Sequence, residues 1–209
     1  MRSATPAALL IFAVSFCAAE TRPAPLHTVV SADIPGLVMR VTSSFAALEP
    51  LRFPIAGATN AERRIFVDSA PDGVVRRMLI VQFEKVQPGS AFRFNFPATP
   101  PRRFGAQVYA ASAGLFDEEQ SAARAPDREA ALTRRFLADR GLKPARIWRV
   151  ARLARVADSQ GLSEVIIFYR ENADTAFPAG VPVEGGALGE AETERLFGAL
   201  EQSIRAVSG

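Results

Sequence analysis

The order of hydrophobic and polar residues in the first half of the chain predicts β-strands separated by turns. Three segments, 37–42 (LVMRVT), 63–68 (RRIFVD) and 74–86 (VVRRMLIVQFEKV), are rich in β-branched and apolar residues, as strands are. Residues 69–73 (SAPDG) are typical of a turn, because proline and glycine supply the backbone angles that a turn needs. We therefore expect 63–68 and 74–86 to form a β-hairpin.

Strict alternation predicts another strand at residues 91–96 (AFRFNF), with three phenylalanines on one face: Phe92, Phe94 and Phe96. Such a face could form an aromatic platform for a sugar or a lipid. We favour the simpler interpretation that it faces the protein core. A proline-rich connector follows, and a strand is expected again at 104–110 (FGAQVYA).

Helical periodicity appears only later in the chain. Residues 117–126 suggest a loop or a short helical turn, and 128–140 a helix that Asp127 caps and Gly141 ends. A second helix is expected at 190–207. One apolar stripe follows it, formed by Leu196, Phe197, Leu200, Ile204 and Val207.

The segment 146–157 (RIWRVARLARVA) fits two structures. Arginine recurs at every third position: Arg146, Arg149, Arg152 and Arg155. As a helix, the segment would be basic and amphipathic, able to lie on an anionic surface. As a strand, it would have two mixed faces, and we favour the strand. These four arginines are the candidate site for binding an anion or a partner, since a guanidinium grips carboxylate or phosphate with two bonds.

The strongest strand signal is 162–170 (LSEVIIFYR), whose unbroken apolar run suggests a central strand buried on both faces. The turn-like residues 158–161 place it in a hairpin with the preceding segment. Runs of neighbouring strands joined by tight turns predict an α+β fold with a largely antiparallel β-sheet of about six to eight strands. We expect the two helices to pack on one face of that sheet.

A glycine- and proline-rich stretch covers residues 172–189. Long segments without regular structure are often functional lids. We favour a connector packed along the surface.

The start of the chain predicts export. Residues 1–19 combine Arg2, a ten-residue apolar run and small residues at Cys17 and Ala19, as a signal peptide does. The run is too short to cross a bilayer, which takes about 20 residues. We expect cleavage after Ala19, a flexible lead-in at 20–35, and one domain at 36–209 in the periplasm or outside the cell.

Lipid anchoring through Cys17 is the less favoured alternative, because Phe16 is bulky for the residue before a lipidated cysteine. Cys17 is the only cysteine, so the exported chain would have no disulfide and no thiol chemistry. No later segment is apolar and long enough for a transmembrane span, so none is expected in the mature chain.

Composition and net charge add little to the prediction of function. With 48% hydrophobic and 22% charged residues, the chain belongs with globular proteins. Loss of Arg2 would lower the net charge from +3 to +2, which does not suggest a nucleic-acid partner. Only two of the 25 basic residues are lysines, Lys85 and Lys143. GC-rich coding accounts for that bias, since alanine, glycine and proline are also plentiful.

Catalytic signatures are missing. His27 is the only histidine, so neither a zinc site nor a nucleophile–histidine relay is expected, and no cofactor or metal is predicted. No nucleophile elbow, phosphate loop or dinucleotide motif occurs. Glu164 and Glu171 flank a predicted strand, and we interpret them as solvated strand ends.

Two functions follow. The favoured one is a non-catalytic exported protein that binds or assembles at the cell envelope, with the four arginines contacting an anionic envelope component or a protein partner. The alternative is a small, metal-free hydrolase or isomerase that depends on carboxylates. That enzyme would need a carboxyl group of raised pKa beside Tyr109 or Tyr169, with 172–189 as a lid.

Overall fold

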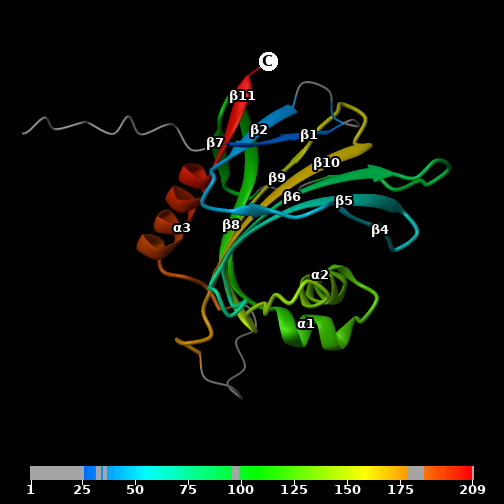
Figure 1. Ribbon diagram of the computed structural model, residues 1–209. Coiled ribbons are helices and arrows are strands. Elements are labelled where there is room, and N and C mark those ends of the chain that lie inside the picture. Colours follow the sequence, from blue (N-terminus) through cyan, green and yellow to red (C-terminus); the bar gives the residue numbers. More distant parts are fainter. Residues whose placement is uncertain (1–25, 32–33, 35–36, 96–98, 178–185, 209) are drawn as a thin grey trace, which may run out of the picture.

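The protein is built around a large antiparallel β-sheet (Figure 1). The computed structural model describes residues 26–31, 34, 37–95, 99–177 and 186–208. Within these residues the main sheet has eight strands in the order β3-β5-β6-β10-β9-β8-β7, with β4 added beside β5. Their bounds are β3 (Ala46–Ala47), β4 (Leu51–Ile55), β5 (Thr59–Ser69), β6 (Val75–Val86), β7 (Pro101–Phe104), β8 (Gln107–Asp117), β9 (Ile147–Val156) and β10 (Ser163–Asn172). A smaller sheet has the order β1-β2-β11, from β1 (His27–Val30), β2 (Leu37–Val41) and β11 (Ile204–Ser208).

The hairpin predicted from 63–68 and 74–86 is confirmed as β5 and β6, which pair antiparallel from Thr59 opposite Val86. Asp72 tightens the turn by accepting a hydrogen bond from the Val74 amide at 3.1 Å. Gly73 has a φ of 85°, and a Cβ there would lie 2.5 Å from the Gly141 carbonyl oxygen. Glycine is therefore required at this turn both for its backbone angle and for the close approach of another chain segment.

The ambiguous segment 146–157 is a strand, β9, as favoured. It pairs with β10 on one side and β8 on the other. Asp158 shapes the β9–β10 turn by accepting from the amides of Gln160 and Leu162. A strand suits this segment because apolar residues occur on both of its faces, and a sheet with cover on both sides buries both.

Three expectations for strands and helix ends are wrong. The strand expected at 104–110 is a hairpin, β7 and β8, which turns at Gly105 with a φ of 59°. Residues 91–95 are not a strand, and Phe96 lies outside the described residues. The last helix, α3 (Glu190–Ser203), ends earlier than expected. Its continuation becomes β11, because pairing with β2 satisfies the backbone there.

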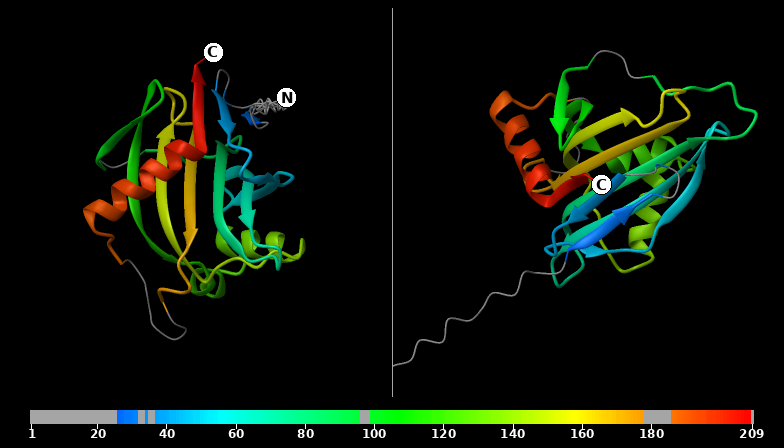
Figure 2. Two further views of the ribbon diagram at one scale, coloured as in Figure 1. Left: turned by 60° about the vertical axis from the view of Figure 1, so that its left-hand side comes forward. Right: turned by 90° about the horizontal axis from the view of Figure 1, so that it is seen from above.

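The structure confirms the α+β class and the largely antiparallel sheet. The helices, however, cover both faces of the main sheet rather than one (Figure 2). Helix α3 contacts β8, β9 and β10 on one face. Helices α1 (Glu118–Arg124) and α2 (Glu129–Ala138) lie on the other, where Leu137 packs with Trp148. The helices divide because β10 is apolar on both faces, Val165 and Ile167 on one and Ile166 and Phe168 on the other.

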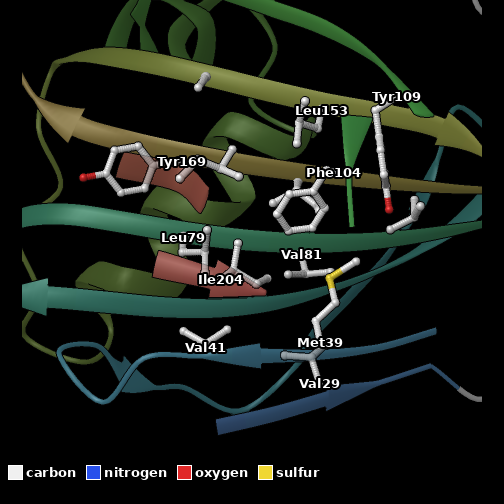
Figure 3. Packing of buried hydrophobic residues seen from close by; sticks show 14 of the residues in the cluster. Val29, Met39, Val41, Leu79, Val81, Phe104, Tyr109, Leu153, Tyr169 and Ile204 are labelled. Atoms are coloured by element: carbon white, nitrogen blue, oxygen red, sulfur yellow. The ribbon is translucent and has the colours of Figure 1, made fainter. Parts of the chain in front are cut away.

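The larger core lies between the main sheet, α3 and the small sheet. Figure 3 shows Met39 and Val41 of β2 and Ile204 of β11 facing Leu79 and Val81 of β6. Strand β1 lies inside the segment 20–35 that was expected to be a flexible lead-in, so that expectation is wrong for residues 27–30. The His27 ring contacts the Phe45 carbonyl oxygen at 2.8 Å, so it has a structural partner.

Local signals explain the two remaining helices. Asp117 caps α1 by accepting from the Gln120 amide at 2.8 Å, and the stretch 117–126 includes the short helix that was one of its two expected forms. Helix α2 starts after Arg128 and has no side-chain cap, so the expected cap from Asp127 is wrong. Gly141 has a φ of 71° and follows the end of the helix, as expected.

Candidate ligand-binding cavity

A cavity of about 790 Å³ lies between the α1–α2 face of the main sheet and the helices that cover it. Alternate residues of β10 form its floor: Glu164, Ile166, Phe168 and Arg170. Side chains of α2 and its N-terminal neighbour, and of the segment 92–95 that follows the β5–β6 hairpin, line other parts of the cavity. Its walls thus combine aromatic rings with buried charged groups, a composition found in sites for small organic molecules.

Two buried glutamates lie side by side in this cavity. Glu84 of β6 and Glu164 of β10 are directly opposite each other in the antiparallel register, and only 8% and 5% of their surfaces are exposed. Burial and the neighbouring Glu84 carboxylate raise the pKa of Glu164 to about 8, although Arg152 opposes the rise. At neutral pH, Glu164 is therefore mostly a neutral carboxylic acid that can donate a hydrogen bond.

The two carboxyl groups differ in their partners. Glu84 accepts from the Thr59 hydroxyl at 3.2 Å and from the Gln82 amide. Burial raises its pKa as well. In contrast, Oε1 of Glu164 is buried without a hydrogen-bond partner, and Nη2 of Arg152 lies 3.6 Å from it. A buried polar atom left without a hydrogen bond costs about 1–3 kcal/mol, and this oxygen is one of two such atoms among the lining residues, the other being Nε of Arg170.

Arg63 ties α2 to the sheet at another side of the cavity. Its side chain is 2% exposed and donates to Gln82, to the Thr133 hydroxyl and to the Glu129 carbonyl oxygen. Burial lowers the pKa of Arg63 to about 10, which leaves the guanidinium charged at neutral pH. This network fixes the position of α2, so the cavity wall is preorganised.

A third buried network holds Arg170. Its Nη1 donates to Oε1 of Glu118 at 2.6 Å, and the Trp148 ring nitrogen donates to the other oxygen at 2.8 Å. The guanidinium carbon lies 5.2 Å from the centre of the Phe116 ring and 5.3 Å from that of Phe168. The Nε of Arg170 is buried and has no hydrogen-bond partner.

The structure separates the four arginines proposed from the sequence. Alternation along β9 puts Arg149 and Arg155 on the α3 face and Arg152 on the cavity face. Arg149 donates to Glu192 of α3 at 2.5 Å, Arg155 lies over the Tyr109 ring at 5.7 Å, and Arg146 pairs with Asp117 at 3.2 Å. Spacing by three does not match a strand period of two, so they form no single basic surface.

The tyrosines of the alternative enzyme are on the wrong side of the sheet. Tyr109 and Tyr169 belong to the core that includes Leu196 and Leu200 of α3, on the face opposite the cavity, and Figure 3 shows both tyrosines among the residues of that core. Tyr169 donates to Glu171 at 3.0 Å, and burial raises its pKa to about 12. The carboxyl of raised pKa is therefore not beside either tyrosine, which removes the motive for that form of the enzyme hypothesis.

Sequence reasoning missed most of the cavity. Glu164 was interpreted as a solvated strand end and is buried instead, while Glu171 has a partner in Arg195 at 2.7 Å. The signal that could have found the site is charge inside apolar strands: Gln82 and Glu84 interrupt the apolar run of β6. Residues 178–185 of the predicted loop 172–189 lie outside the described residues, as do the signal segment 1–19 and Cys17.

Comparisons with known proteins add no relative: no family model, no curated protein and no solved structure matches the chain. Across the described ranges, no helix is long and apolar enough to cross a membrane. In the same part of the chain, no three histidine, cysteine, aspartate or glutamate side chains group in a way that could hold a metal ion.

Proposed function

We propose that this protein is a non-catalytic, exported binding protein that takes a small organic molecule into the cavity between the main sheet and α1–α2. The observation that carries the proposal is the Glu164 carboxyl oxygen, which is buried in the lining without a hydrogen-bond partner. Buried polar groups in native proteins almost always have partners. A ligand group that donates to this oxygen would supply the missing one.

Size and wall chemistry support the same function. A cavity of about 790 Å³ lies within the range of sites that enclose small molecules. Ile166, Phe168 and Phe116 offer apolar surface, and Arg152 and the glutamate pair offer polar contacts beside it. Because Arg63 already anchors α2 through several bonds, binding would require little rearrangement of the cover.

The proposal is tested by filling the cavity from an exposed lining position. Ser112 of β8 lines the cavity opposite Arg152 and is exposed, so Ser112→Phe would occupy space without overpacking the core. We expect phenylnaphthylamine, an uncharged fluorescent probe, to bind the wild type saturably. Ser112→Phe should weaken that binding about tenfold or more, because the added ring takes the place of the probe against the apolar cavity wall. The contact area that the probe loses there is worth more than about 1.4 kcal/mol.

Val108→Phe is the matched control, because Val108 lies on the same strand, is 52% exposed and does not line the cavity. It should bind the probe as the wild type does. Circular dichroism confirms that each variant is folded. If the wild type does not bind the probe, or if Ser112→Phe binds it as tightly as the wild type, the proposed function is wrong.

A catalytic role is the second candidate, favoured by one observation: two facing carboxyl groups in a cavity, one with a pKa of about 8. Glu164 would act as the acid and Glu84 as the second carboxylate, as in glycoside hydrolysis. This function predicts slow hydrolysis of nitrophenyl glycosides that Glu164→Gln abolishes and Glu171→Gln retains. Equal rates for the wild type and Glu164→Gln would leave binding as the only candidate.

A further inference from the structure

We infer that the ligand is an organic anion with an apolar body, and that Arg170 recognises its charged group. This inference rests on the proposed function and names the chemical class of the molecule that the cavity takes. It starts from Arg170, the buried arginine whose Nε lacks a hydrogen-bond partner in the cavity lining.

Arg170 is held as a fixed cation. Glu118, which is fully buried, accepts one of its Nη donors and is itself held by the Trp148 ring nitrogen. The rings of Phe116 and Phe168 lie about equally far from the guanidinium carbon, at 5.2 and 5.3 Å. A guanidinium carries five donors in a rigid fork, so the bond to Glu118 fixes the position of the group and uses one of its donors.

The rest of the lining fits an anion with an apolar body. Five arginines and three glutamates line the cavity, so its charge favours a negative ligand. Arg152 also lies 6.0 Å from the Phe168 ring, so two guanidinium groups flank this one aromatic surface. A carboxylate or sulfonate at Arg170 would place its apolar body over Phe168 and Ile166 along the floor.

A second polar point lies further along the same strand. Glu164 and Arg170 are on the same face of β10, six residues apart, which is about 20 Å between their Cα atoms at 3.3 Å per residue. Oε1 of Glu164, which has an ion-pair contact with Arg152 but no hydrogen bond, and Nε of Arg170 thus lie toward opposite ends of the cavity floor. An elongated anion with a hydrogen-bond donor at its far end would satisfy both.

The test uses two probes that differ only in one charge. Anilinonaphthalene sulfonate has the same aromatic body as phenylnaphthylamine and adds a sulfonate. We expect the wild type to bind the sulfonate more tightly, and Arg170→Met to weaken the binding of the sulfonate about tenfold or more, because a hydrogen bond to a charged group is lost. Binding of phenylnaphthylamine should stay within about twofold of the wild type.

Arg170→Met leaves the buried Glu118 carboxylate without its cation and could impair folding. The double variant Arg170→Met/Glu118→Gln avoids that charge and keeps an acceptor for Trp148, so it should fold and still bind the sulfonate weakly. Arg102→Met is the control, since Arg102 pairs with Glu194 and Glu201 of α3. It should bind both probes as the wild type does.

The outcomes separate this inference from the proposed function. The inference is wrong if the wild type prefers the uncharged probe, if the double variant keeps the affinity for the sulfonate, or if it loses both probes equally. In each of these cases the wild type still binds the uncharged probe, so the proposed function stands. If neither probe binds the wild type, the proposed function fails together with the inference.

Discussion

At the scale of single residues, the balance of charges in the cavity is set by neighbours that are distant in the sequence. Glu164 lies in an apolar strand next to Glu84 of another strand, and their side-by-side burial favours the neutral form of the carboxyl. Arg152, the nearest cation, is 3.6 Å away, too far to form a normal hydrogen bond. The protein thus holds a carboxyl group under conditions that oppose its ionisation, as sites for ligands or catalysis often do.

Stability should therefore depend on pH through Glu164. Its folded pKa of about 8 lies above the ordinary value of 4.5, so the folded state binds the proton more tightly than the unfolded state does. The stabilising contribution of Glu164 is fully present below about pH 4.5 and is lost as pH rises through the window to about pH 8, by up to about 1.4 kcal/mol per pH unit. Above that window the loss stays constant.

Glu164→Gln removes this titration. Urea unfolding across the window should show the variant gaining stability relative to the wild type as pH rises from about 5 to about 8. Glu171→Gln is the control, because Arg195 and other partners lower the pKa of Glu171, so its titration lies below this window. A stability difference between Glu164→Gln and wild type that does not change with pH would show that Glu164 is ionised throughout.

At the scale of elements, alternation and turn chemistry predicted much of the sheet. The β5–β6 and β9–β10 hairpins follow from apolar runs on either side of Pro, Gly and Asp residues. The prediction of one strand at 104–110 was wrong because Gly105 makes a tight turn within that segment. The residues on both sides of the turn are strands, so the sequence pattern does not show the break. The prediction of a strand at 91–95 was wrong because an alternating pattern becomes a strand only where a neighbouring strand pairs with it.

The candidate site was much less predictable than the strands. Arg149 and Arg155 share a spacing with Arg152, yet the pleat turns them to the other face, toward α3. Glu118 and Arg170 meet across 52 residues of sequence. No local sequence pattern predicts such a pairing, because it depends on the order of the strands in the sheet. Charged residues inside apolar strands were the one available clue.

At the scale of the whole molecule, export remains a prediction from residues 1–19. The structure describes residues from 26 onward, and its first strand starts at His27. N-terminal sequencing of the protein recovered from the cell envelope or the medium should give Glu20 as the first residue. An intact Met1 in protein recovered from the cytosol would contradict the compartment. A blocked N-terminus at Cys17 would instead support the lipid-anchored alternative.

The small sheet joins segments that are far apart in the sequence. Strand β11 pairs along its length with β2, Ile204 opposite Val41, although more than 160 residues separate the two strands. A ribosome makes β2 early and β11 among the last residues described. The core around Ile204 therefore cannot close until synthesis has passed β11, long after β2 and the strands of the main sheet have been made.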